Sequence, residues 1–239
     1  MRREVHGWHS DRLGRHMNII VHGHWGPPMI LFPTSGGDEG EYERQSLIGA
    51  IGDLIDAGRV KTYSVNLNHW DAFANRQAHP FHRSWMQRQY DAYIRHEVIP
   101  FIYSHCQAAV PVWTMGASLG AYHAANTLFK YPDVVKRCFA LSGVYDMKNF
   151  MDGAYDENFY FNNPVDYLAN ASDPWMLGHL ASCDIHIATG SGPWEKSGES
   201  YRLSQILSSR GIRHHLDDWG QMGGHDWPYW KHQMREYLK

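Results

Sequence analysis

Residues 116–120, Gly-Ala-Ser-Leu-Gly, contain a serine in a setting that could make it a nucleophile. An apolar run, Val112 to Met115, precedes them, and a segment with helical spacing follows. A Gly-x-Ser-x-Gly string between a strand and a helix is typical of a strained turn that lifts the hydroxyl clear of the sheet. The glycines leave room for the turn, because a side chain at either position would collide with the neighbouring strand or helix. We therefore predict that Ser118 is a nucleophile rather than an ordinary helix-capping serine.

A serine hydroxyl attacks a carbonyl at neutral pH only with the help of a base, which a third group must orient. His225 lies in Gly-Gly-His-Asp-Trp-Pro, residues 223–228, after the last predicted strand and before the last predicted helix. Because the chain has 17 histidines, this place in the topology, and not the residue type, selects His225. Activity should then fall in acid as His225 takes up a proton.

The acid of such a triad stands between the serine and the histidine in chain order. Glu195 is the first carboxylate after the apolar strand 185–188, and it is our prediction for the acid. Glu199 is the alternative. Asp217 and Asp218, one strand later, are less favoured.

The negative oxygen that forms during attack needs donors that are fixed before the reaction, and backbone amides provide them. We predict one donor at the amide of Leu119, directly after the nucleophile. The second should come from the loop 33–39, Pro-Thr-Ser-Gly-Gly-Asp-Glu, whose small residues allow close approach. The amide of Ser35 is favoured, with Gly36 as its neighbour and a candidate contact to substrate.

Aromatic side chains near the expected carboxyl ends of strands could form a substrate pocket. Trp194 and Trp227 are the main candidates, with ordinary packing as the alternative. Four others are less favoured: Trp70, Trp85, Tyr160 and Phe161.

Apolar runs and helical spacing alternate along the chain and predict the scaffold. Strands are expected at 17–21, 29–32, 60–67, 112–115, 138–141, 185–188 and 214–216, with 17–21 and 29–32 joined by a turn. Helices are expected at 47–58, at 84–104 with a bend near Pro100, at 118–129, at 199–209 and at 230–238. Residues 144–178 are weakly periodic and should cross the sheet edge. This alternation predicts an α/β fold with a mostly parallel sheet covered on both faces and no large lid domain.

Length and composition indicate the number of domains, the kind of partner and the cellular location. With 239 residues, one domain spanning 1–239 is expected. Twenty-two Lys and Arg against 25 Asp and Glu give a net charge of −3, which makes nucleic acid an unlikely partner. No apolar run suits a membrane span or a secretion signal. Three widely spaced cysteines, Cys106, Cys138 and Cys183, indicate free thiols, so a cytoplasmic location is expected.

Two histidine pairs suggest metal ligands: His22 with His24, and His214 with His215. No acidic cluster or known ligand spacing completes a set, so we expect no metal and no organic cofactor. His123, in the helix after Ser118, is expected to be packed and hydrogen-bonded rather than a second base.

The sequence resembles the Putative esterase family of α/β-hydrolases, which includes S-formylglutathione hydrolases, feruloyl esterase modules and mycolyltransferases. It looks most like compact single-domain bacterial members, and the likeness runs from about residue 4 to the C-terminus. The residues that carry it are 32–37 (Phe-Pro-Thr-Ser-Gly-Gly), 116–124, 141–146 and 225–228. This resemblance implies the fold, serine-esterase chemistry, Ser118 as nucleophile and His225 as base.

The chain departs from the family pattern at one place. Many relatives have Asp roughly where Pro193 stands, whereas the pair Trp194-Glu195 resembles a variant of the compact subgroup. We therefore expect hydrolysis of a small-molecule carboxylic ester, or of a thioester, by a Ser-His-Glu triad. The alternatives are acyl transfer from the same acyl-enzyme and a non-catalytic hydrolase fold that only binds. The oligomeric state is open, with a homodimer among the options.

Overall fold

An eight-stranded sheet forms the centre of the computed structural model, which describes residues 1–239. Its strand order is β1-β2-β4-β3-β5-β6-β7-β8. The strands are β1 (Arg3–Ser10), β2 (Arg15–His22), β3 (Pro28–Phe32), β4 (Lys61–Val65), β5 (Val112–Ala117), β6 (Val135–Leu141), β7 (Asp184–Thr189) and β8 (His215–Asp218). β1 and β2 pair antiparallel and β2 is antiparallel to β4, whereas every pairing from β4 to β8 is parallel.

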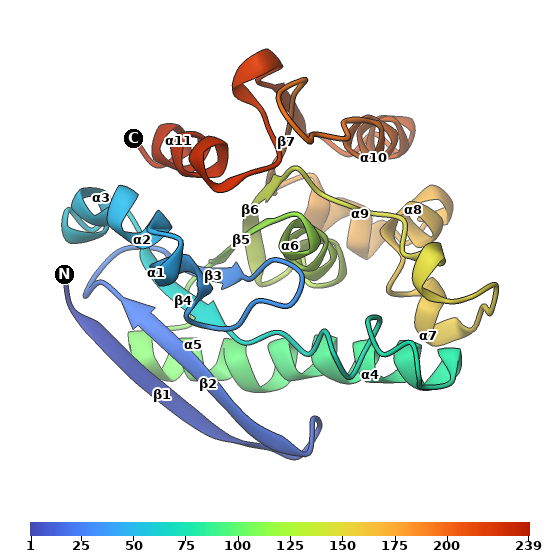
Figure 1. Ribbon diagram of the computed structural model, residues 1–239, viewed down its shortest axis with the longest axis horizontal. Coiled ribbons are helices and arrows are strands. Elements are labelled where there is room, and N and C mark those ends of the chain that lie inside the picture. The colour runs from blue at the N-terminus through green and yellow to red at the C-terminus, as the bar shows by residue number, and fades with distance from the viewer.

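Helices cover both faces of this sheet (Figure 1). On one face lie α1 (Glu41–Arg44), α2 (Leu47–Ala50), α3 (Gly52–Asp56) and α11 (Trp227–Tyr237). On the other lie α4 (Pro80–Tyr93), α5 (Ile99–Cys106), α6 (Leu119–Lys130) and α10 (Gly198–Ser209). Between β6 and β7 come the short helices α7 (Glu157–Tyr160), α8 (Pro164–Tyr167) and α9 (Pro174–Leu180). The predicted α/β fold is confirmed.

Two apolar cores follow from the alternation of side chains along the strands. In β3, Ile30 and Phe32 point into the larger core beneath α4, α5 and α6. Met29 and Leu31 point into the smaller core beneath α1 to α3 and α11. A strand buried on both faces in this way is a rigid support for the loops at its carboxyl end.

The sequence prediction differs from the structure at the N-terminal edge of the sheet. The strand β1 was not predicted, because its residues alternate between exposed and half-buried and include few apolar side chains. Residues 17–21 and 29–32 do form strands joined by the short connection 23–27, as predicted, and β4 lies between them in the sheet.

The predicted bend near Pro100 is a change of helix type. Residues Ile94–Val98 form a π-helical turn between α4 and α5. Pro100 lacks an N–H and its ring excludes the usual bond to the carbonyl four residues earlier, so a wider turn accommodates it. The predicted helix 47–58 is likewise divided, into α2 and α3, at Ile51.

None of the helices has both the length and the apolar character required to cross a membrane.

Candidate active site

Ser118 lies on a sharp turn between β5 and α6. Its backbone has φ 56° and ψ −119°, a conformation that a non-glycine residue rarely adopts. A Cβ on Gly116 would lie 2.1 Å from the carbonyl oxygen of Gly120, and a Cβ on Gly120 would lie 2.2 Å from that of Phe32. Gly116 is therefore required for the start of α6 to lie against β5, and Gly120 for it to lie against the end of β3. The turn leaves the Ser118 side chain half-buried at the carboxyl end of β5.

Backbone amides face the same end of the sheet. Leu119 is the first residue of α6, so its N–H has no acceptor within the helix. In the loop after β3, the N–H of Ser35 makes no hydrogen bond within the protein. Gly36 follows with φ +76°. Both predicted oxyanion donors are thus unoccupied N–H groups.

Three residues hold the Ser35 loop; two of them, Glu41 and His69, were not candidates from the sequence, and the third, Trp70, was a less favoured pocket candidate. The Glu41 carboxylate, which is 9% exposed, accepts from the Thr34 N–H at 2.7 Å and from its hydroxyl at 2.6 Å. His69 Nε2 lies 2.9 Å from Ser35 Oγ. Trp70 packs on Gly36, where an added Cβ would meet the indole at 3.1 Å. No local pattern signals these contacts, because α1 and the segment after β4 supply them.

His225 and Glu195 face each other across two loops at the carboxyl ends of β7 and β8. His225 Nδ1 lies 3.7 Å from Glu195 Oε2. The Glu195 side chain is 1% exposed, its Oε1 accepts from Thr189 Oγ1 at 2.9 Å, and its Oε2 has no hydrogen-bond partner. A buried carboxylate oxygen without a donor favours an N–H close by, and His225 Nδ1 is positioned to supply one. The Ser118 hydroxyl makes no hydrogen bond to His225 in this structure; such bonds are often long before substrate binds.

The loops that carry the acid and the histidine are joined by backbone hydrogen bonds. Ser191 N–H donates to Gly220 O at 2.8 Å, Gly192 N–H to Gly223 O at 3.0 Å, and His225 N–H to Pro193 O at 2.9 Å. Glycine permits this approach, since a Cβ on Gly190 would lie 2.4 Å from Gly223 O. The relative position of Glu195 and His225 is therefore fixed by main chain.

The variant Gly223→Ala should disrupt that position. Its Cβ would lie 2.6 Å from Thr189 O and 2.9 Å from Gly190 Cα, and backbone atoms cannot move away cheaply. We expect the rate of ester hydrolysis to fall about a hundredfold, the usual cost of displacing a catalytic group by roughly 1 Å. Steady-state kinetics will measure it. The control is Gly178→Ala, where a Cβ meets nothing within 4 Å; equal rates in the two variants would contradict the prediction.

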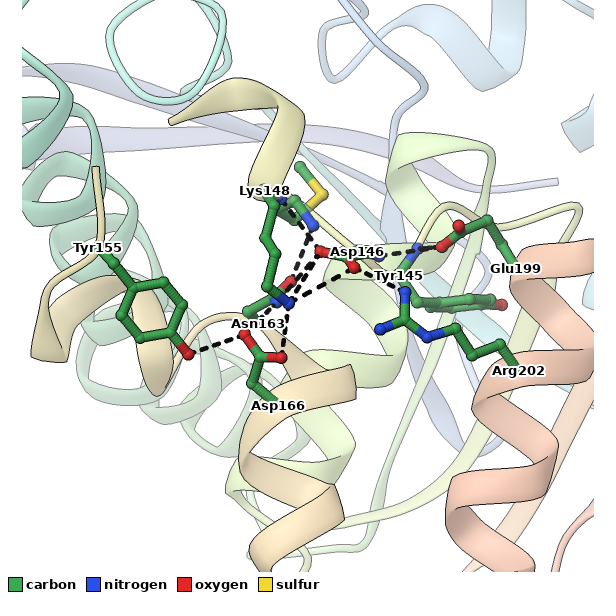
Figure 2. Close-up of polar contacts among 9 residues, drawn as sticks. Tyr145, Asp146, Lys148, Tyr155, Asn163, Asp166, Glu199 and Arg202 are labelled. Atoms are coloured by element: carbon green, nitrogen blue, oxygen red, sulfur yellow. Dashed lines mark hydrogen bonds and ion pairs between the residues drawn. The ribbon is translucent and has the colours of Figure 1, made fainter. Parts of the chain in front are cut away.

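Of the four carboxylates considered for the acid, only Glu195 lies within 4 Å of a His225 nitrogen. Glu199 Oε2 instead accepts from the backbone N–H groups of Tyr145 and Asp146, at 3.2 and 3.0 Å. Figure 2 shows Glu199 and Arg202, from the same helix, both directed at this segment. Glu199 thus fastens α10 to the loop after β6.

The two aspartates of β8 also have other partners. Asp217 accepts from Tyr237 OH at 2.7 Å and faces His186 Nδ1 at 2.9 Å. Asp218 accepts from the Gly220 N–H and from Tyr201 OH. Neither carboxylate is directed at His225.

The two tryptophans predicted to contact substrate differ in their surroundings. Trp194 has φ 65° and is 84% exposed, directly before Glu195. Trp227 is half-buried between the rings of Tyr42 and Trp230, at centroid distances of 5.5 and 5.2 Å. Trp194 is therefore open to a ligand, and Trp227 packs α11 against α1.

His123 is buried in α6 among aromatic rings. Its ring lies 5.9 Å from that of Phe32, 5.2 Å from that of Tyr90 and 4.8 Å from that of Tyr122. It is packed as expected, but it forms no side-chain hydrogen bond. Burial, with His69 nearby, lowers the pKa of His123 from 6.5 to about 3.

Acid should therefore destabilise the fold through His123. The unfolded chain protonates this group near pH 6.5 and the folded protein only near pH 3, so stability contributed at neutral pH is lost as pH falls between these values. At pH 4 the loss is about 3 kcal/mol. His123→Phe should flatten the decline of Tm from pH 7 to pH 4, measured by circular dichroism. His9→Phe, at an exposed histidine, should not; an unchanged slope in His123→Phe would contradict the assignment.

Two side-chain groups have the spacing to hold a metal ion. One is Glu4, His6 and His105; the other is Asp184, His186 and His215. Of the histidines weighed from the sequence, only His215 belongs to either group. His22 instead faces Glu43 at 2.7 Å, and His214 Nε2 lies 2.7 Å from Ser204 Oγ. Neither group lies among the predicted triad residues.

Ser118 is strained and follows a buried strand, and His225 precedes the last helix. Together with a mostly parallel sheet covered on both faces, these features are typical of a hydrolase of the α/β-hydrolase fold. The chain belongs to the Putative esterase family, whose sequence profile matches residues 31–239. It is thus a carboxylic ester hydrolase, and the resemblance noted from the sequence is confirmed.

Solved structures with the same fold are similar over almost the whole chain. A ferulic acid esterase aligns with a TM-score of 0.75 at 16% identity, over 99% of this chain and 96% of its own. An S-formylglutathione hydrolase from Agrobacterium tumefaciens has a TM-score of 0.73 at 14% identity, over 99% and 92%. MPT51 of Mycobacterium tuberculosis has 0.75 at 14%, over 100% and 97%. No curated protein sequence matches the chain.

Proposed function

We propose that this esterase works through an acyl-enzyme on Ser118, with His225 as base and Glu195 as the acid of the triad. Ser118 Oγ attacks the ester carbonyl while His225 Nε2 takes its proton. His225 then donates that proton to the departing alcohol, and a water activated by His225 cleaves the acyl-enzyme. Glu195 holds the imidazole through Nδ1 and stabilises its cation. The amides of Leu119 and Ser35 stabilise the tetrahedral oxyanion.

The observation that carries this proposal is the buried Glu195 carboxylate, whose only unsatisfied oxygen faces His225 Nδ1 at 3.7 Å. An ionised group out of water is costly unless a partner compensates it. The imidazolium that attack on the carbonyl generates on His225 is the partner that would compensate it. The loop hydrogen bonds at Gly192 and His225 support the same pairing, because they set the distance before substrate arrives.

The side chains around Ser118 determine which substrates are accepted. Trp194 offers an exposed aromatic surface directly before Glu195, and Trp70, also exposed, packs on Gly36 in the Ser35 loop. The similarity in fold to a ferulic acid esterase and an S-formylglutathione hydrolase makes aryl esters and thioesters the first substrates to test. Trp227 contributes through its packing on Tyr42.

The test is an activity screen over oxygen esters and thioesters of increasing acyl length, with Ser118→Ala as the blank. We expect release of acid and alcohol or thiol in equal amounts. Added alcohol acceptors separate hydrolysis from acyl transfer, since transfer yields a new ester instead of the free acid. A serine-directed organophosphonate should label Ser118 in the folded protein. Absence of both turnover and labelling would favour a fold that only binds.

We further propose that residues 1–239 act as one domain in a reducing compartment. All three cysteines are free thiols, which supports a cytoplasmic location.

A further inference from the structure

The edge strand β1 carries polar side chains on the side that faces the helices. Along the strand, exposed positions alternate with less exposed ones. In its C-terminal half, the inward Trp8 and Ser10 both donate to the Glu97 carboxylate, at 2.8 and 2.9 Å. These bonds fasten that half of β1 to the helix layer. In the N-terminal half, the inward residues are Glu4 and His6, which have a different partner.

That partner is His105, in the last turn of α5. Glu4 Oε2 lies 3.3 Å from His6 Nε2 and 3.5 Å from His105 Nε2. Both distances exceed the usual N–H···O length of about 2.7–3.2 Å. Donor atoms that bind one Zn²⁺ at about 2.0–2.1 Å in tetrahedral directions lie roughly 3.3–3.4 Å apart, which is close to what is observed. Because His105 is far from β1 in the chain, no ligand spacing in the sequence indicates this group.

The two imidazole rings are held by their neighbours. Their planes are inclined by 63° with centroids 5.1 Å apart, and both rings pack on Phe101, at 5.1 Å for His6 and 5.5 Å for His105. His105 Nδ1 lies 2.9 Å from the Tyr63 hydroxyl. When Nδ1 donates to that oxygen, the lone pair of the ring is on Nε2, the nitrogen that faces Glu4. Metal-binding histidines usually donate their other N–H in this way.

The charges around the group also suit a cation with nitrogen ligands. Arg2 Nε lies 2.7 Å from Glu4 Oε1, which leaves Oε2 to face the histidines. Burial, with Lys61 nearby, lowers the pKa of His105, so its ring is neutral at neutral pH and can bind a metal through its lone pair. The three side chains are half-buried, with exposures from 16% to 32%, so an ion can reach them from solvent.

The other group with metal-ligand spacing, Asp184, His186 and His215, is less suited. Its two imidazole rings are stacked, with planes inclined by only 11°, so their lone pairs lie in nearly parallel planes and do not converge. His186 also faces two carboxylates, Asp217 at 2.9 Å and Asp184 at 3.1 Å. This pairing accounts for the position of His186 without a metal.

We propose that Glu4, His6 and His105 form a zinc site, in which the two Nε2 atoms, Glu4 Oε2 and one water bind Zn²⁺. Two imidazoles with one carboxylate favour Zn²⁺ over Mg²⁺ and Ca²⁺, which prefer oxygen ligands. The ion fastens the N-terminal half of β1 to α5, as Glu97 fastens the C-terminal half. The site is separate from the proposed triad, because β2, β4 and β3 lie between β1 and β5.

The test is titration calorimetry of the untagged, chelator-treated protein with ZnCl₂ alone. The unaltered protein should bind Zn²⁺, and His6→Gln should raise the Kd at least about tenfold. His9→Gln is the matched control, since His9 lies on the exposed row of the same strand with its side chain 61% exposed. It should bind as the unaltered protein does. His215→Gln, which removes a donor from the other group, should also retain the affinity.

Two further measurements separate metal binding from an effect on folding. Zn²⁺ should raise the melting temperature of the unaltered protein and of His9→Gln, but not of His6→Gln or Glu4→Gln. Co²⁺ should give the strong visible absorption of a tetrahedral ion with the unaltered protein only weakly or not at all with these two variants. Without metal, all variants should hydrolyse ester at the same rate. The proposal is overturned if the unaltered protein binds no Zn²⁺, if His6→Gln and Glu4→Gln bind it as tightly, or if His9→Gln loses affinity equally.

Discussion

Ser118→Ala should lower the rate of ester hydrolysis by about 10³ to 10⁶-fold, the largest effect expected of any substitution in this protein. The alanine methyl group cannot attack a carbonyl, and what should remain is the stabilisation that we propose the Leu119 and Ser35 amides give to attack by water. The backbone at this position is strained, with φ 56°, and alanine keeps that geometry. The KM should therefore change less than kcat, which steady-state kinetics will resolve.

The matched control for this substitution is Ser209→Ala, at the C-terminal end of α10. Its hydroxyl bonds only to Ile206 O, so hydrolysis should be unchanged. The organophosphonate should add its mass to the unaltered protein and to Ser209→Ala, but not to Ser118→Ala. A loss of only tenfold in Ser118→Ala, or continued labelling of it, would remove Ser118 from the mechanism.

Glu195→Gln should lower kcat by about 10² to 10⁴-fold with little loss of stability. Glutamine has the same shape but no charge, and its amide can direct an N–H toward His225 Nδ1, which would hold the wrong tautomer. The melting temperature should stay level or rise, because Glu195 is 1% exposed and its Oε2 lacks a donor in the free protein. A collapse of rate without a collapse of Tm distinguishes catalytic orientation from a structural role.

Glu199→Gln and Asp217→Asn are the comparisons that this prediction requires. Each should retain hydrolysis within a few-fold, since Glu199 holds the backbone of Tyr145 and Asp146 (Figure 2) and Asp217 is engaged by Tyr237. Glu199→Gln should lower the melting temperature modestly, because a neutral oxygen accepts two N–H bonds less strongly. If Glu199→Gln loses the rate and Glu195→Gln keeps it, the acid has been assigned to the wrong residue.

Elements with strong internal periodicity were predictable because their signal is local. An apolar run predicts the buried strand β5, and helical spacing predicts α6. The junction between them predicts the sharp turn at Ser118. Weak or interrupted elements were not. β1 lacks an apolar face, and the π-helical turn before Pro100 has no pattern that separates it from an ordinary bend.

Contacts between distant segments explain what sequence reasoning missed at the site. Glu41, His69 and Trp70 lie on segments that no spacing rule connects to Ser35, yet they contact its loop. The glycines at 190 and 223 were visible in the sequence, but that their backbones touch follows only from the parallel pairing of β7 and β8.

Local sequence patterns were enough to predict the α/β architecture, the serine turn and the family, because hydrophobic period, glycine placement and chain order can be read along the chain. Only the folded structure shows which carboxylate faces His225 and what holds the Ser35 loop. These contacts depend on which side chains are buried and which lie close together in the folded protein. Both are set only when loops that are far apart in the chain come together.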